Sequence, residues 1–138
     1  MAEQDKEAAR LAELKRMLIM DSAQEQAYDD ITRLAASVCG TPIALISLVD
    51  DHRQWFKSRV GVEHDSIPRA KAPCGQVADQ AAMLVIHDLL EDEEYRDSLL
   101  AASGVRFYAG APLITQDGFC LGAMCVLGMA PRALTEKE

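Results

Sequence analysis

The chain has 138 residues, of which 49% are hydrophobic and 26% are charged. This length fits one domain with one hydrophobic core. The chain has 14 Lys and Arg residues against 22 Asp and Glu residues, a formal net charge of −8 that argues against nucleic acid or anionic lipid as a partner. No apolar run approaches the ~20 residues of a membrane-spanning helix, and the N-terminus is charged where a signal peptide would be apolar. We therefore expect a cytoplasmic protein without a membrane partner.

The cysteine and histidine residues follow no metal-binding pattern. No Cys-x-x-Cys pair occurs, and the three histidines lie away from the cysteines in no zinc-ligand spacing. A chain of this size does not need a disulfide framework. We expect no metal site, and we expect reduced, mostly buried thiols. The cysteines are Cys39, Cys74, Cys120 and Cys125.

Two helices are predicted at the start of the chain. Residues 3–20 are rich in strong helix formers. A second helix is expected to begin at Asp21 and Ser22, because Ser22 and Glu25 have the spacing of a capping box. It should end at Gly40, which Pro42 follows. The apolar stripe of the first helix is Ala8, Leu11, Leu14 and Leu18, and the apolar face of the second is Tyr28, Ile31, Leu34, Ala35 and Val38.

A hairpin of two strands is predicted next. Residues 43–49 form a continuous apolar run that is typical of a central strand. After a short turn, residues 53–60 alternate, so that Trp55 and Phe56 point to opposite faces of the sheet. Three basic side chains share the face of Trp55 and are expected to be solvated surface: Arg53, Lys57 and Arg59.

The second half of the chain predicts a mixture of loops, one short helix and three strands. Residues 61–73 read as a loop, 74–82 as a short helix and 83–86 as a strand. The acidic stretch 88–97 is expected to hold only a helical turn. Residues 106–114 and 119–127 flank an Asp-Gly turn and predict a hairpin. The resulting class is α+β, with an antiparallel sheet and helices packed on one face.

The chain carries six strings that are weak signals singly and specific together: AYDDITRLAA at Ala27 to Ala36, PIALISLVD at Pro42 to Asp50, RQWFKSRVG at Arg53 to Gly61, RFYAGAPL at Arg106 to Leu113, LGAMCVL at Leu121 to Leu127 and PRALT at Pro131 to Thr135. On these strings the chain resembles the GAF domain, a sensory module of bacterial signalling proteins such as histidine kinases and diguanylate cyclases. The resemblance implies a central antiparallel sheet of five or six strands. It places helices from both chain ends on one face, and a ligand cavity under loops and the short helix on the other.

The resemblance also implies a function and a domain organisation. Residues 1–138 would be a single GAF domain, residues 1–20 would extend a homodimer interface, and an output domain would follow Glu138 in a longer signalling protein. The expected role is a non-catalytic sensor that binds a small molecule and transmits a conformational signal to the output domain. Two alternatives stay open: an enzyme similar to the GAF-related free methionine sulfoxide reductases, and a structural dimerisation module without a ligand.

Six residues are candidates for the ligand site. Cys74 opens the short helix, where a lowered thiol pKa or simple packing would both fit. Arg106 and Tyr108 share one strand face and would suit an anionic molecule, unless Arg106 instead pairs with the acidic residues 91–94. At most one of two neighbouring aromatic rings should face the cavity, with Phe56 favoured for the core. The candidates are Trp55, Phe56, Cys74, Gln76, Arg106 and Tyr108.

The sequence does not identify a cofactor, but it argues against two that GAF relatives bind, a bilin and haem. The short helix reads Cys74-Gly75-Gln76 where bilin-attaching relatives have Cys-Ala-His, so a covalent bilin is not expected. Haem has no evident axial ligand. The reductases also need a cysteine shortly before the penultimate strand, where this chain has Ala101 and Ala102.

Overall fold

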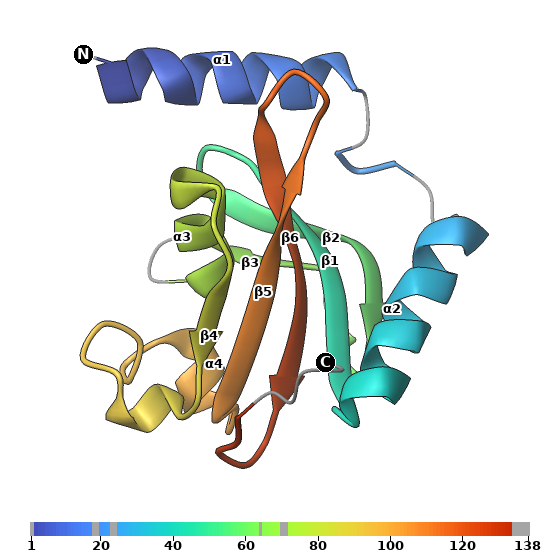
Figure 1. The fold of residues 1–138 in the computed structure, drawn as a ribbon, viewed down its shortest axis with the longest axis vertical. Helices are drawn as coiled ribbons and strands as arrows, with labels where there is room; N and C mark the ends of the chain where they lie inside the picture. Colours follow the sequence, from blue (N-terminus) through green and yellow to red (C-terminus); the bar gives the residue numbers. More distant parts are fainter. Residues whose placement is uncertain (1, 18–19, 23–24, 64, 70–71, 134–138) are drawn as a thin grey trace.

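The core of the protein is one six-stranded sheet. The computed structural model, which describes residues 2–17, 20–22, 25–63, 65–69 and 72–133, has the strand order β3-β2-β1-β6-β5-β4 (Figure 1). All five strand pairings are antiparallel, and the predicted α+β class is confirmed. The strands are β1 (Ile43–Val49), β2 (Arg53–Val60), β3 (Ser66–Pro68), β4 (Leu84–Ile86), β5 (Phe107–Ile114) and β6 (Cys120–Gly128).

The helices cover both faces of this sheet. In Figure 1, α1 crosses over the tip of the β5–β6 hairpin, and α2 flanks β1 and β2. The helix α3 lies on the opposite side, where it contacts β5 and β6. The helical elements are α1 (Ala2–Arg16), α2 (Gln26–Cys39), α3 (Pro73–Gln80), the 3-10 turn η1 (Leu89–Glu91) and α4 (Leu99–Ala102).

The side chains of β1 show how the two faces are divided. Leu45 and Val49 pack with Cys74 and Val77 of α3 in the largest apolar cluster. Leu48 points the other way and packs with Leu14 of α1, as expected from strand alternation. We name the first side the α3 face and the second the α1/α2 face. The predicted placement of the short helix opposite the N-terminal helices is confirmed.

The second helix differs from its prediction at the start and on its surface. It begins at Gln26, and Glu25 makes no side-chain capping bond. The predicted capping box is wrong because Ser22 instead accepts a hydrogen bond from Lys57 Nζ at 2.7 Å. The predicted end is confirmed: Gly40 has a left-handed φ of 63°, which glycine adopts without strain.

The apolar faces predicted for the first two helices are only partly buried. In α1, Leu14 is buried and Ala8 is exposed, whereas Leu18 lies outside the described residues. In α2 the sheet side is formed by small side chains, including the buried Thr32. Three of the predicted core residues of α2 are instead solvent-exposed, because the larger side chains lie away from the sheet: Ile31 (50%), Leu34 (64%) and Val38 (51%).

The prediction of a solvated basic face on β2 is wrong for Lys57, which lies beside a β-bulge and is covered by the start of α2. Ser47 pairs with Phe56 and Ile46 pairs with Ser58, so Lys57 is an extra residue between them. Lys57 is only 1% exposed, and its Nζ lies 2.5 Å from a carboxylate oxygen of Glu25. Its ammonium also lies 5.3 Å from the centre of the Tyr28 ring. The strand therefore carries a buried cation that fixes the start of α2 to the sheet.

Three further differences concern short elements. The strand β3 lies inside the segment that reads as a loop, and α4 follows the single turn expected in the acidic stretch. The strand β3 has 3 residues and α4 has 4, so neither is long enough for its hydrophobic periodicity to be recognised in the sequence. Residues 129–133 form no helix, and the rest of the expected C-terminal helix lies outside the described residues.

Candidate ligand groove and buried thiol cluster

A groove of about 660 Å³ lies beside α3. Its walls come from the turn after β1, the segment that precedes α3, α3 itself and the turn around Tyr95. The fold brings these segments together because α3 packs back onto β1, β5 and β6. The side chains and backbone that line the groove belong to Asp51, His52, Arg69, Ala72, Gly75, Gln76, Asp79, Gln80, Glu94 and Tyr95.

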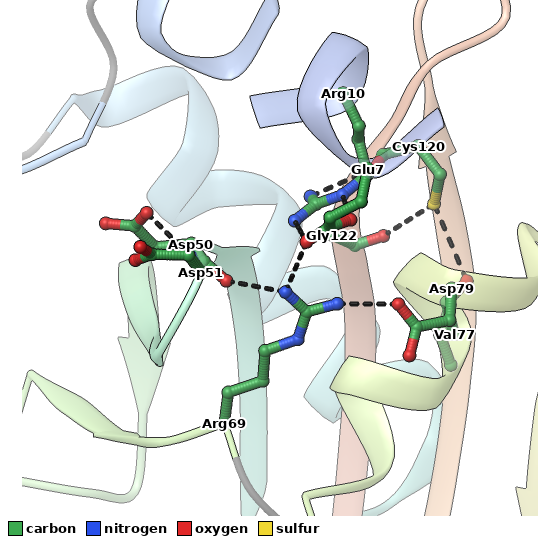
Figure 2. A network of polar contacts seen from close by, with 9 residues as sticks. All are labelled: Glu7, Arg10, Asp50, Asp51, Arg69, Val77, Asp79, Cys120 and Gly122. Atoms are coloured by element: carbon green, nitrogen blue, oxygen red, sulfur yellow. Dashed lines mark hydrogen bonds and ion pairs between the residues drawn. The ribbon is translucent and has the colours of Figure 1, made fainter. Parts of the chain in front are cut away.

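Arg69 is the central polar residue of the groove. Its Nη2 donates to Asp79 Oδ1 of α3 at 2.6 Å, and its Nη1 donates to Glu7 Oε2 of α1 at 2.6 Å (Figure 2). The same Nη1 donates to the backbone oxygen of Asp50 at 2.9 Å, where β1 ends. Charge-assisted bonds of this kind are stronger than neutral ones. One guanidinium thus joins a groove wall, the sheet and the N-terminal helix.

Glu7 extends this network along α1 to the sheet. Its carboxylate accepts bonds from Arg10 at 2.8 and 3.1 Å, and Arg10 Nη1 donates to the backbone oxygen of Cys120 at 3.3 Å (Figure 2). Hydrogen bonds from Arg10, followed by those from Arg69, lower the pKa of Glu7 from 4.5 to about 2, against the opposing effect of burial. We name Glu7, Arg10, Arg69 and Asp79 the arginine relay.

The groove has a polar and mixed-charge lining. Three carboxylates, those of Asp51, Asp79 and Glu94, line it together with the guanidinium of Arg69 and the imidazole of His52. The Tyr95 hydroxyl donates to Gln76 Oε1 at 2.5 Å, and burial raises the pKa of that hydroxyl. Such a lining suits a small polar molecule that offers several hydrogen-bonding groups.

A cluster of sulfur and polar side chains lies beneath α3. Cys74 Sγ is 3.0 Å from the Tyr108 hydroxyl and 3.7 Å from Cys125 Sγ of β6. Hydrogen bonds lower the pKa of Cys74, chiefly that with Cys125, and bonds from Tyr108, Ser47 and Gln54 add to the effect. The Cys125 thiol has a raised pKa because of its bond with Cys74 and its burial. We name these five residues the thiol cluster.

Two details show how tightly the thiol cluster is built. A Cβ at Gly110 would lie 2.2 Å from the Tyr108 hydroxyl oxygen, so the glycine leaves the room that the phenol ring occupies. Gln54 Nε2 donates to Ser47 Oγ at 3.2 Å. Its Oε1, although buried, has no hydrogen-bond partner among the described residues. The cluster therefore combines two thiols with a buried acceptor that is still open.

The structure separates the six candidate site residues into four places. Gln76 lines the groove, whereas Cys74 and Tyr108 lie below it in the thiol cluster. Trp55 packs with Leu14 of α1 and Phe56 lies in the core of the α3 face, and both also border a smaller hollow of about 380 Å³. Arg106 forms two hydrogen bonds with Asp88, at 2.6 and 2.7 Å, at the start of the acidic stretch.

Several residues of the groove and the thiol cluster were not identified from the sequence. Arg69 lies in a segment that reads as a loop, and its partner Glu7 is 62 residues away, so no local pattern marks it. Gln54 alternates with Trp55 on β2 and could have been assigned to the α3 face by the same period that placed Phe56. Cys125 had no signal beyond its buried strand.

No candidate metal site or membrane-spanning helix lies in the part of the chain that the structure describes. Within that part, no group of three His, Cys, Asp or Glu side chains could hold a metal ion. None of the helices there has the length and apolar character to cross a membrane.

Comparison with known proteins gives matches at the level of sequence and of fold. The chain is 33% identical over 135 residues to the cyclic di-GMP phosphodiesterase PA2567 of Pseudomonas aeruginosa, a match that covers 96% of this chain and 23% of that protein. The type II free methionine-R-sulfoxide reductase of Thermoplasma acidophilum superposes with a TM-score of 0.68 at 12% identity, over 90% of this chain and 83% of that one. The GAF domain of an Acinetobacter phosphoenolpyruvate-protein phosphotransferase gives a TM-score of 0.66 at 14% identity, and the match covers 99% of this chain and 82% of that one.

These matches correct one expectation and establish the family. The expectation that the isolated domain is not an enzyme is contradicted, because the sequence relative is named as a phosphodiesterase. The chain spans less than a quarter of that relative, so the comparison concerns one region of it. At identities of 12 and 14%, the structural matches show the shared fold. A family model described as the GAF domain matches residues 24–138, and the chain belongs to the GAF domain family.

Proposed function

We propose that this GAF domain senses a small polar molecule in the groove and passes the signal through the arginine relay to α1. The observation that carries the proposal is the position of Arg69, which bonds to Asp79 in the groove wall and to Glu7 on the N-terminal helix. A ligand that offers a carboxylate or phosphate to Arg69 would compete with both partners. Its binding would therefore change how firmly α1 is held.

The physical mechanism is a shift between two populations. In one state α1 is fixed by Glu7 and Arg10; in the other, Arg69 bonds to the ligand and the hold on α1 is weaker. The signal can be no larger than the difference in ligand affinity between the two states. The difference in affinity arises at Arg69, because a ligand can form charge-assisted bonds with this guanidinium only in the state in which Glu7 and Asp79 have released it.

We further propose that the regulated output is the hydrolysis of cyclic di-GMP by a longer protein. The support is the 33% identity to a cyclic di-GMP phosphodiesterase of which this chain covers 23%. The domain would then be the regulatory part of an enzyme, in place of the histidine kinase or diguanylate cyclase expected from the sequence. A cytoplasmic location is consistent with four free cysteines.

Homodimerisation is the remaining part of the proposal, and α2 supports it better than α1 does. Ala27, Ile31, Leu34 and Val38 are exposed and follow the 4-3-4 spacing of a coiled-coil seam. Sedimentation equilibrium should show a dimer that Leu34→Glu dissociates, whereas Arg33→Glu, a neighbouring exposed change, leaves it intact. A monomeric wild-type chain would contradict this part.

Ligand binding can be tested by thermal unfolding against a defined panel. The panel would contain free amino acids, small carboxylic acids and mono- and cyclic nucleotides, each measured with the wild-type chain. A true ligand at 100 times its Kd should add about 2.7 kcal/mol to the free energy of unfolding. Arg69→Gln should abolish that gain, and Arg33→Gln, which alters an exposed ion pair of α2, should retain it. A gain that survives Arg69→Gln unchanged would contradict the proposed site.

A further inference from the structure

Two of the four cysteines are neighbours in space although 51 residues separate them. Cys74 Sγ of α3 and Cys125 Sγ of β6 lie 3.7 Å apart, and the side chains are 2% and 1% exposed. A disulfide requires about 2.05 Å between the sulfurs, so closure needs an approach of about 1.7 Å. Small rotations of the two side chains can supply a movement of this size.

We propose that Cys74 and Cys125 form a reversible disulfide when the domain meets a hydroperoxide, which makes the thiol cluster a redox modification site. The inference does not depend on the groove ligand, since both electrons come from the two cysteines and the oxidant is the peroxide itself.

The reaction balances in two steps. The Cys74 thiolate attacks one peroxide oxygen, so an S–O bond forms, the O–O bond breaks and the leaving hydroxide takes up a proton to become water. Cys125 then attacks the sulfur of the Cys74 sulfenic acid; the S–S bond forms, the S–O bond breaks and a second water leaves. Two thiols are oxidised, and one hydrogen peroxide is reduced to two waters.

The surroundings assign different roles to the two cysteines. Cys74 has the lowered pKa, and it lies in the first turn of α3, where the helix dipole favours a thiolate. Ala72 and Gly75, two positions before and one position after Cys74, line the groove, so the backbone of this turn borders the groove while the Cys74 sulfur is buried beneath it. Cys125 has a raised pKa and lies on the central strand β6, so it would act as the resolving thiol.

The other two cysteines provide contrast. Cys120 lies on the same strand as Cys125, but its Sγ is near backbone oxygens of Val77 and Gly122, and burial raises its pKa. Cys39 is half-buried on α2, on the other face of the sheet. Cys74 and Cys125, by contrast, lie with their sulfurs next to each other.

A disulfide here would have a structural consequence. It would link the first turn of α3 covalently to β6 and would replace the Cys74 thiol, which now contacts the Tyr108 hydroxyl, by a disulfide sulfur. Because α3 forms one wall of the groove, oxidation would restrict the movement of that wall.

The test counts free thiols after exposure to hydrogen peroxide. The 138-residue chain is treated with hydrogen peroxide, and the reaction is quenched. The chain is then denatured without reductant and alkylated with iodoacetamide, and mass spectrometry of the intact chain gives the number of alkyl groups. The untreated chain should carry four alkyl groups, and the oxidised chain should carry two, with a return to four after dithiothreitol. Oxidised glutathione, which is too large to reach buried sulfurs, should leave four.

Matched variants identify the pair. Cys74→Ala and Cys125→Ala should each keep three alkylated thiols after peroxide, and Cys120→Ala should lose two of its three. If Cys125→Ala does not fold by circular dichroism, peptide mapping of oxidised Cys120→Ala gives the same answer, because Cys125 is then the only cysteine in its tryptic peptide. Four remaining thiols in the wild type, with methionine sulfoxide formed to show that the peroxide reacted, would overturn the proposal. So would a disulfide that persists in Cys74→Ala or Cys125→Ala.

Discussion

Both faces of the sheet bury polar side chains, but the two faces differ in how those side chains are paired. On the α1/α2 face, Lys57 reaches Glu25 and Ser22, and Ser58 donates to Asp29 Oδ1 at 2.6 Å. On the α3 face, Cys74 and Tyr108 contact each other, and Gln54 Oε1 has no partner among the described residues. Paired polar groups stabilise a fold, whereas a thiol of lowered pKa, such as Cys74, and an open acceptor can react or bind. We infer that the first face anchors helices and that the second face carries the chemistry.

The largest effect is expected at Gly110, which lies against the buried Tyr108 side chain on the α3 face. Gly110→Ala should lower the free energy of unfolding by about 3 kcal/mol, because the new Cβ would overlap the buried Tyr108 phenol. Urea unfolding measures this loss. In a Tyr108→Ala background the same change should cost less than about 1 kcal/mol, since the ring is gone. An equal loss in both backgrounds would show that the ring does not lie over the glycine.

A smaller effect is expected at Lys57, which tests whether the polar groups of the α1/α2 face serve as anchors. Lys57→Ala should cost about 2 kcal/mol, because it removes both the ion pair with Glu25 and a buried aliphatic stem. Lys57→Met retains the stem and should recover much of that loss. The matched control is Arg59→Ala on the same strand, with an expected change of about 0.5 kcal/mol. If Lys57→Ala is as mild as Arg59→Ala, the anchor role is wrong.

The smallest effect concerns pH and the arginine relay, which joins the two faces. The pKa of Glu7 is about 2 in the folded chain against 4.5 as its ordinary value, so ionised Glu7 stabilises the folded state. This contribution is complete above pH 4.5 and is lost as the pH falls from 4.5 towards 2. The part lost should be about 1 kcal/mol, since the side chain is partly exposed and its ion pairs are screened by solvent. In Glu7→Gln, the free energy of unfolding measured between pH 2 and pH 6 should lose the part of its pH dependence that comes from Glu7. A pH dependence equal to that of the wild type would contradict the stabilising role of ionised Glu7.

The sequence predicts the fold of this chain better than its site, for a physical reason. Strands such as β1 and helix ends such as Gly40 are encoded locally, by runs of apolar residues and by one residue that adopts a positive φ. The relay and the thiol cluster depend on contacts between distant segments, such as Arg69 with Glu7 and Cys74 with Cys125. Lys57 shows the same limit, because it lies on the strand face that the alternation predicts but is buried there by Ser22, Glu25 and Tyr28, which are distant in sequence.

Hydrogen exchange of α1 tests the central claim, that Arg69 connects the groove to the N-terminal helix. In Arg69→Gln, the amides of residues 2–16 should exchange faster than in the wild type, while those of α2, which has its own anchor at Lys57, should be unaffected. Arg33→Gln on the exposed side of α2 is the control and should leave α1 as protected as in the wild type. Equal protection of α1 in Arg69→Gln and the wild type would contradict the account.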